Sequence, residues 1–273
     1  MEEQLLNKNN SKGIAGSTLK LIAIISMLID HTGATIVERM LVTNPANFDA
    51  MGELKLTPIV ILYFAMRTIG RLAFPIFIYL MLEGFKYTRN RWRYLGRLAI
   101  FAIISEIPFD MAFNLKSSQV LEGKIIEFTY QNVFLTLAIG LLTIMLVEKI
   151  RELNKKNDSK FLYFILELFI VLVGMVLAVV LKTDYSCMGV LAIYVGYCIS
   201  KKDLQEPKKS TSMIIAICIT LVLSSPIEAV ALVDTFAIAK YNGKRGINLK
   251  WIFYLFYPVH LLILSVICIV MGL

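Results

Sequence analysis

The sequence predicts an all-α membrane protein, a polytopic transmembrane helical bundle of about nine spans. Of its 273 residues, 58% are hydrophobic and 18% are charged, and the mean hydropathy is +0.71. Apolar runs of membrane-spanning length recur along the whole chain, which a soluble core of this size does not require. The net charge of +8 lies mostly between these runs, so it is a topology signal and does not indicate a nucleic-acid partner.

The expected spans follow the apolar runs in order, at residues 19–37, 58–83, 94–113, 130–148, 161–181, 186–200, 211–223, 227–240 and 250–271. The segments between them alternate between a side with twenty-one Lys and Arg and a side with five, namely Arg39, Lys55, Lys116, Lys124 and Lys182. Cytoplasmic segments carry the basic excess, so the N-terminus is expected in the cytoplasm and the C-terminus outside. Residues 1–17 are then a cytoplasmic tail, and residues 18–273 a single multi-span domain in the cell membrane.

The stretch 211–240 is long for one span and short for two, although both of its flanks are basic. Two alternatives satisfy this parity: a tight pair of spans, or a re-entrant hairpin that turns at LSSPIE with Pro226 at the bend. The four cysteines lie in apolar segments without metal-ligand spacing, and Gly-rich phosphate loops are missing. We therefore expect neither a metal site nor a cytosolic type of catalytic domain.

Ionisable residues inside the spans are the candidates for chemistry. At about 1.5 Å per residue, His31 lies about 16 Å beyond Lys20, and Arg67, Glu106 and His260 lie about 14–15 Å from the ends of their own spans. Four spans thus carry an ionisable group near the middle of a hydrocarbon core of about 30 Å. Such groups are costly in lipid, so they pair with one another or face a water-filled cavity.

Helical geometry limits how these groups can pair. Asp30 and His31 are neighbours and point about 100° apart on a regular helix, so we expect them to have separate partners. Two positive charges, Arg67 and Arg71, share one helix face and need negatively charged partners. Glu106 and Asp110 offer a matching face on the third span, and Asp30 is another candidate. Pro108, between the two acids, can bend that span.

Several segments resemble the TraX family of membrane proteins. They are LKLIAIISMLIDHTGA, RTIGRLAFPIFIYLMLEGFKYTRNRWRYLGRLAIF and ISEIPFDMAF, and the shorter YQNVFLTLAIGL and FYPVHLLIL also fit. The resemblance is dense over residues 18–113, whereas residues 201–249 add little. Its motif residues are Asp30 with His31, Arg67, Gly70, Arg71, Phe74, Pro75, Glu83, Gly84 and the segment 105–110, in family-like order and spacing.

The TraX resemblance implies an acyltransferase. The family's namesake acetylates the N-terminus of F-pilin, and the family is similar to transmembrane acyltransferases that include the acyltransferase type 3 proteins and heparan-alpha-glucosaminide N-acetyltransferase. The implied reaction moves an acyl group, expected to be acetyl, from cytoplasmic acyl-CoA to an amine or hydroxyl at or across the membrane. The acceptor is left open between a peptide N-terminus such as that of pilin, an amino sugar and a glycan hydroxyl.

Acyl transfer needs a base, and His31 suits this role because an unperturbed histidine has a pKa of about 6.5. His31 could instead attack the thioester and form an acyl-histidine. The sequence does not choose between the two routes. Asp30, Glu106 and Asp110 are the acids that would fix the imidazole tautomer or balance an imidazolium.

Four arginines are candidates for binding the CoA phosphates, because guanidinium groups bind phosphate through paired hydrogen bonds. Arg67 and Arg71 lie in the second span, and Arg89 and Arg91 lie in the loop KYTRNRWRYLGR, whose basic charge is also what topology alone requires. Asn132, His260 and Tyr257 are candidates for contacting the acceptor, although Asn132 could merely start a helix and His260 could merely pack. The expected partners are acyl-CoA, a peptide or small-molecule acceptor and the lipid bilayer.

A proton-coupled transporter or flippase is the alternative reading, because intramembrane Asp, His, Arg and Glu also form proton relays. The short apolar segments 186–200 and 211–240 favour it, since transporters use broken helices. The crowding of charged residues into the first three spans and the lack of an internal repeat favour the enzyme.

Overall fold

A computed structural model describes residues 13–49, 51–154, 159–248 and 250–273. Within these residues the regular secondary structure is helical, and β-pairing is limited to isolated bridges, which confirms the all-α class. Five helices there are long and apolar enough to cross a membrane: Gly16–Thr43, Pro58–Tyr87, Val133–Asn154, Lys160–Val180 and Trp251–Met271. Most of the expected N-terminal tail, residues 1–12, lies outside the described residues.

The chain divides into two compact units. Unit 1 comprises the described residues of Met1–Phe77, Ile104–Glu127 and Lys240–Leu273, and unit 2 comprises Ile78–Ile103 and those of Phe128–Ala239. Two helices, α5 (Ala73–Tyr87) and α6 (Arg91–Phe109), contribute to both units.

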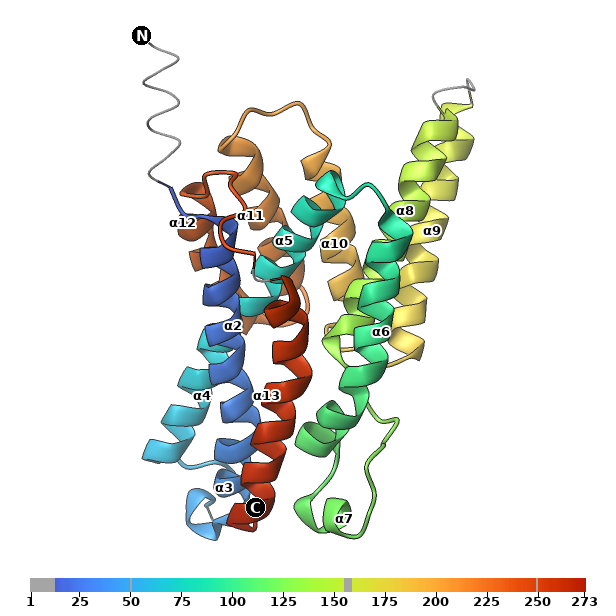
Figure 1. The fold of residues 1–273 in the computed structure, drawn as a ribbon. Helices are drawn as coiled ribbons and strands as arrows, with labels where there is room; N and C mark the ends of the chain where they lie inside the picture. The colour runs from blue at the N-terminus through green and yellow to red at the C-terminus, as the bar shows by residue number, and fades with distance from the viewer. Residues whose placement is uncertain (1–12, 50, 155–158, 249) are drawn as a thin grey trace. The chain divides into compact units, whose positions relative to one another are not determined.

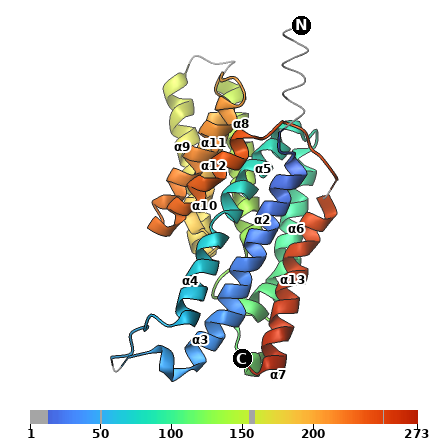
Figure 2. The ribbon, with the colours of Figure 1, turned by 90° about the vertical axis from the view of Figure 1, so that its left-hand side faces the viewer.

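Unit 1 contains one long rod of three consecutive helical segments. These are α2 (Gly16–Thr32), the π-helix η1 (Gly33–Val37) and α3 (Glu38–Thr43). The other elements of unit 1 are the 3₁₀-helix η2 (Pro45–Asn47), α4 (Pro58–Gly70), the π-helix η3 (Asp110–Asn114), α7 (Ser117–Leu121) and α13 (Lys250–Met271). Helix α2 packs against both α4 and α13, which run beside it (Figures 1 and 2).

The span expected at 58–83 corresponds to the candidate span Pro58–Tyr87, which a short turn interrupts. Pro58 begins α4, where its missing N–H is not needed. The helix ends at Gly70, a turn at residues 71 and 72 follows, and α5 begins at Ala73. The hydroxyl of Ser26 on α2 donates to the carbonyl of Ile69 at 2.5 Å, so the break satisfies one of its backbone groups through the neighbouring helix.

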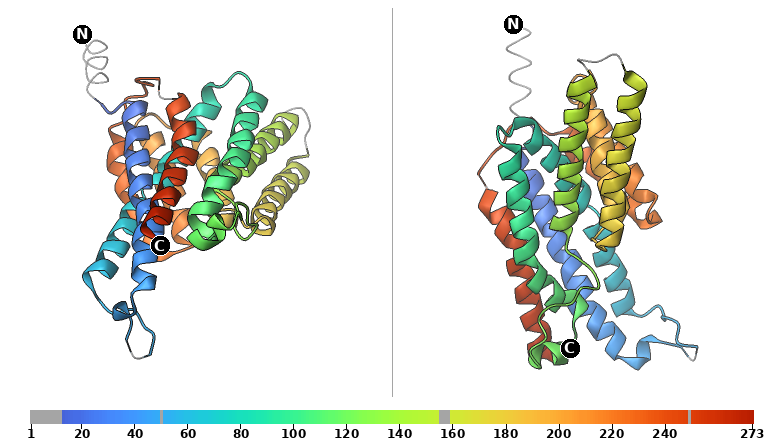
Figure 3. Two further views of the ribbon diagram at one scale, coloured as in Figure 1. Left: turned by 60° about the horizontal axis from the view of Figure 1, so that its bottom comes forward. Right: turned by 90° about the vertical axis from the view of Figure 1, so that its right-hand side faces the viewer.

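Unit 2 is a bundle built on α8 (Val133–Asn154), α9 (Lys160–Val180), α10 (Ser186–Ser200) and α11 (Lys208–Val222). Helices α8 and α9 run side by side (Figure 3), and α10 packs against both of them and against α11. Much of the apolar surface of α9 faces outward, with Phe161 79% and Phe169 61% exposed. Such a surface is typical of a helix that contacts lipid.

The chain turns back after α11, in the segment LSSPIE. The 3₁₀-helix η4 (Pro226–Val233) begins at Pro226 and packs against α11, where the thiol of Cys218 donates to the carbonyl of Ala231 at 3.3 Å. The short α12 (Asp234–Ala239) completes the unit. The expected bend at Pro226 is therefore present, although the returning segment is a 3₁₀-helix followed by a helix of 6 residues.

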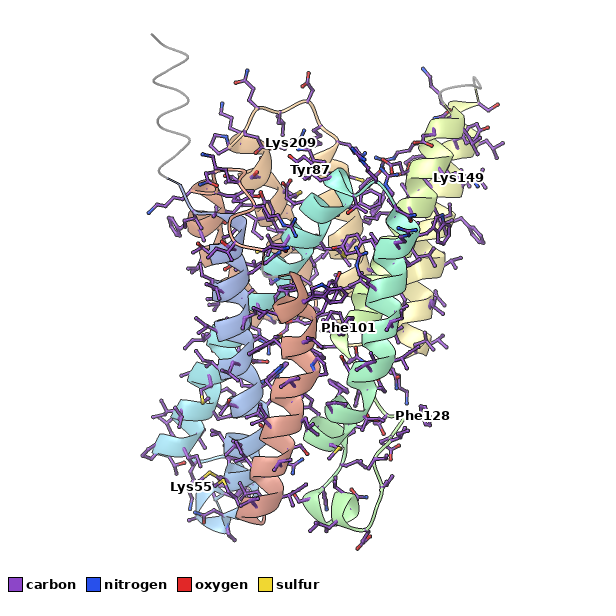
Figure 4. The ribbon with its side chains drawn as sticks, viewed as in Figure 1. Lys55, Tyr87, Phe101, Phe128, Lys149 and Lys209 are labelled. Carbon is purple, nitrogen blue, oxygen red and sulfur yellow. The ribbon has the colours of Figure 1, made fainter. Side chains whose placement is uncertain are left out.

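Labelled side chains mark the two ends of unit 2. Tyr87, Lys149 and Lys209 lie at one end and Phe128 at the opposite end, whereas in unit 1 Lys55 lies far from the start of α2 (Figure 4). Two buried acids of unit 2 form ion pairs with basic side chains. Glu148 pairs with Arg91 and with Lys201 (2.6 Å), and Glu167 pairs with Arg151 while accepting a hydrogen bond from Tyr194 (2.7 Å).

Candidate active site

The last turn of α2 places two polar side chains in different directions. Asp30 contacts α4, and His31 contacts α13. The expectation of separate partners for these neighbours is confirmed, because successive residues of a helix point about 100° apart. The site is therefore two polar clusters that share one helical turn.

The first cluster is an ion pair in which two guanidinium groups share one carboxylate. Arg67 Nη1 lies 2.8 Å from Asp30 Oδ2, and Arg71 Nη2 lies 3.1 Å from Asp30 Oδ1. Arg71 Nε also donates to the carbonyl of Arg67 at 3.0 Å, which fixes the guanidinium at the end of α4. The side chain of Arg67 is 28% exposed, against 15% for Arg71 and 12% for Asp30, so Arg67 is the most accessible of the three.

The second cluster joins the two histidines of the chain. His31 Nδ1 lies 2.7 Å from His260 Nε2, and His260 Nδ1 lies 2.6 Å from the carbonyl oxygen of Phe256. His260 is 4% exposed. The rings of Phe113 and Tyr257 meet the imidazole of His31 edge-on, with centroids 5.2 Å and 5.8 Å away. Two aromatic rings and a hydrogen bond thus fix the orientation of His31.

Two π-helices flank this cluster. Helix η1 begins two residues after His31, and η3 carries Phe113. Pro108 lies inside α6 just before η3, where its missing N–H favours a departure from α-helical bonding. Single-turn π-helices occur often at functional sites, so their position supports the assignment of this region.

The two acids of the third span differ from expectation. Asp110 is fully buried, but its Oδ1 accepts from Asn114 Nδ2 at 2.6 Å and its Oδ2 from the backbone N–H of Glu127 at 2.8 Å. Its carboxylate therefore orders the chain after η3. Of the acids that the sequence offered as partners of the two arginines, Asp30 is confirmed, and Asp110 is not their partner. Glu106 lies one turn earlier on α6. Catalytic roles for Glu106 and Asp110 stay predictions.

Three other site candidates belong to unit 2. Arg89 is exposed in the loop before α6, whereas Arg91 pairs with Glu148 and lies 4.3 Å from the centroid of the Phe85 ring. Asn132 is fully buried. Its amide donates to the carbonyl of Ala102 at 2.7 Å and its carbonyl accepts from the N–H of Phe134 at 3.1 Å. Asn132 thus serves the start of α8, which was the structural alternative for this residue.

Arg39 forms a polar centre. From the sequence it was expected only as a charge that indicates topology. Its guanidinium donates to the Ser117 hydroxyl at 2.9 Å and to four carbonyls, those of Met111, Ala112, Leu115 and Leu273. Arg39 thereby ties α3 to the end of η3, the element that carries Phe113. A lone arginine near the end of a predicted span gives no sequence signal for such a role, because most of its partners are backbone oxygens.

The fold and these two clusters define a class: a helical protein of the membrane type with a buried site of paired histidines and carboxylate-bound arginines. The chain belongs to the TraX family, whose model, described as TraX protein, matches residues 15–268. The resemblance predicted from the sequence is therefore confirmed. A curated relative from Dichelobacter nodosus, named probable fimbrial assembly protein FimC, serogroup H1, is 28% identical over 252 residues, which cover 90% of this chain and 92% of the relative. No solved structure matches the chain.

Proposed function

We propose that this protein is a multi-pass acyltransferase of the cell membrane that moves an acetyl group from cytoplasmic acetyl-CoA to an amine or hydroxyl acceptor. The proposal includes about nine membrane crossings, with the N-terminus in the cytoplasm and the C-terminus outside. Membership of the TraX family supports the reaction class, and the alternation of basic segments supports the orientation.

The observation that carries the proposal is the placement of His31 and Asp30 on one turn of α2. His31 is held by His260 and two aromatic rings, and Asp30 holds Arg67 and Arg71. A base and a cationic group side by side are what acyl transfer from a polyanionic thioester donor requires. The partly exposed Arg67 is the group best placed to meet a phosphate or the thioester oxygen.

The reaction balances on either route. In direct transfer, the acceptor attacks the thioester carbonyl carbon, His31 Nε2 takes the acceptor proton, and the C–S bond breaks. In the covalent route, His31 Nε2 itself attacks the carbonyl carbon, and the acyl group passes to the acceptor in a second step. Both routes end with an acylated acceptor and a protonated CoA thiol.

A protein N-terminus is the first acceptor to test. The D. nodosus relative is named as a fimbrial assembly protein, and an N-terminal amine of a fimbrial subunit is an acceptor within the implied class. Amino sugars and glycan hydroxyls are the other acceptors of that class. They differ in nucleophilicity but need the same base.

The test is release of CoA and label transfer from radiolabelled acetyl-CoA by the purified protein. Short peptides with a free N-terminal amine, glucosamine and a glycan are offered as acceptors, and His31→Ala and His31→Gln are compared with the wild type. Loss of a general base costs about 10²–10⁴ in rate. We expect a loss of at least about a hundredfold in both variants, while gel filtration and thermal unfolding stay close to those of the wild type.

The alternative function is proton-coupled transport. Measurements on the same purified protein decide between the two functions. Absence of acetyl-CoA binding and of turnover in the wild type, together with substrate flux in sealed vesicles, would replace the acyltransferase by a transporter. Turnover that His31→Ala abolishes would exclude that reading.

A further inference from the structure

The hydrogen bonds of His260 determine which of its nitrogens carries a proton. His260 Nδ1 lies 2.6 Å from the Phe256 carbonyl oxygen, and a carbonyl can only accept. Nδ1 of His260 therefore bears a hydrogen. Burial among apolar helices favours an uncharged ring, and in an uncharged imidazole the second nitrogen, Nε2, is an acceptor.

The proton on His260 in turn fixes the tautomer of His31. His260 Nε2 lies 2.7 Å from His31 Nδ1, and because Nε2 accepts, His31 Nδ1 must donate. The imidazole of His31 then has its lone pair on Nε2. The chain of hydrogen bonds runs from His31 through His260 to the carbonyl of Phe256, and it leaves the nitrogen at its free end ready to act as a base or a nucleophile.

The geometry of the two rings suits transfer of the shared proton. Their planes differ by 7°, and their centroids are 4.9 Å apart while the nitrogens are 2.7 Å apart. The contact therefore runs edge to edge, with the hydrogen between two facing lone-pair directions. The ring of Phe256 lies against His260, with centroids 4.6 Å apart. Packing therefore fixes the orientation of both histidine rings.

We propose that His260 is a positioning and proton-relay residue for His31. The inference rests on the proposed acyltransferase function and adds a residue to it. When His31 Nε2 takes the proton of the acceptor, the Nδ1 proton of His31 moves to His260 Nε2. The positive charge then lies on His260, which still donates to the Phe256 carbonyl. As the C–S bond breaks, the thiolate takes a proton from His31 Nε2, and the relay reverses.

The same relay serves the covalent route. When His31 Nε2 attacks the carbonyl carbon and the thiolate leaves, the Nδ1 proton passes to His260, so the acyl-histidine is neutral. When the acceptor attacks the acyl group, His31 leaves with its Nδ1 proton returned from His260. The acceptor proton ends on the CoA thiolate. His260 thus has one role on both routes.

The position of the Asp30 ion pair is consistent with a relay that starts at His31 and ends at His260. Arg67 and Arg71 bind the carboxylate of Asp30, the residue directly before His31 on α2, whereas His260 lies on α13 and binds the carbonyl of Phe256. A proton that moves from His31 to His260 thus passes from the helix that carries this ion pair to α13.

Nitrogen-15 magnetic resonance of the whole protein tests the relay without substrate. Only two histidines are present, so histidine-labelled protein gives ring signals from His31 and His260 alone, and single variants assign them. We expect a hydrogen on Nδ1 and a bare Nε2 in both rings. On acidification we expect the first proton to change Nε2 of both rings together. A hydrogen on Nε2 of His31, or protonation of His31 with no change at His260, would overturn the proposal.

Kinetics of His260 variants test the role in turnover. In His260→Gln the amide oxygen can accept from His31 Nδ1 but cannot take a proton, so we expect kcat to fall about tenfold or more with KM for acetyl-CoA unchanged. His260→Glu, whose carboxylate can take the proton, should recover part of kcat, and His260→Ala should not. A His260→Gln protein with wild-type kcat contradicts the relay. An inactive wild type refutes the acyltransferase instead, and the ring signals still decide on the relay.

Discussion

Asp30 and Gly70 touch across helices α2 and α4, and the Asp30 side chain occupies the space that any Cβ at position 70 would need. Gly70 lies three residues after Arg67 and directly before Arg71, so the bare backbone at this point brings the carboxylate between the two guanidinium groups. The glycine of the RTIGR motif is thus a requirement of close approach between helices and not of backbone conformation.

Gly70→Ala should lower stability and activity together. Forcing a methyl group into the space of Asp30 typically costs about 1–3 kcal/mol, and it pushes the carboxylate away from its arginines. The matched control is Gly96→Ala in α6, where a Cβ meets nothing within 4 Å, and where alanine should gain up to about 1 kcal/mol of helix propensity. Thermal unfolding in detergent gives both values. Equal behaviour of the two variants would contradict the close contact.

Asp30→Asn should be more damaging than its small change in size suggests. The amide keeps the shape but removes the charge that two guanidinium groups share, and breaking a buried ion pair from one side costs about 3–5 kcal/mol. Because Arg67 is partly exposed, we expect the low end of that range. Adding Arg67→Gln to Asp30→Asn should recover part of the loss. The control Asp203→Asn, at an exposed position, should change unfolding by less than about 0.5 kcal/mol.

Arg89→Ala should raise KM for acetyl-CoA about two- to fivefold without changing kcat. Arg89 is exposed, whereas Arg91 in the same loop is bound to Glu148, so Arg89 is the loop arginine more available to a phosphate. The effect should fade at high salt because exposed charge contacts are screened. The control is Lys182→Gln, at a position after α9 whose backbone carbonyl accepts from the N–H of Gln131. This variant should leave KM unchanged. If KM for acetyl-CoA is the same in Arg89→Ala, in Lys182→Gln and in the wild type, the loop is excluded from donor binding.

Hydrophobic runs and charge spacing were sufficient to predict the helical class and to identify Asp30, His31, Arg67 and Arg71 as members of one region. The separate directions of Asp30 and His31 also followed from the helix period alone. These inferences succeed because they depend on geometry within one helix, which the sequence specifies directly.

Contacts between segments distant in sequence were harder to predict. His31 and His260 are 229 positions apart, and their pairing depends on how α13 packs beside α2. Depth in the membrane placed both at one level but could not give the rotation of either helix. Asp110 shows the opposite error, because its spacing to Glu106 matched the arginines while its oxygens bind Asn114 and the backbone of Glu127. Backbone donors leave no trace in side-chain spacing.

The π-turn η1 lies between His31 and Arg39 on one continuous rod. A π-turn accommodates one residue more than an α-helical turn, so the helices on its two sides keep the mutual orientation that they would have without the extra residue. If Gly33–Val37 became α-helical at unchanged chain length, Arg39 would rotate by about 100° relative to His31. A deletion of one residue that restores a regular helix would leave this orientation unaltered. The alignment of the two polar contacts is therefore more vulnerable to a missense change that converts the turn to α-helix than to a single-codon deletion within it.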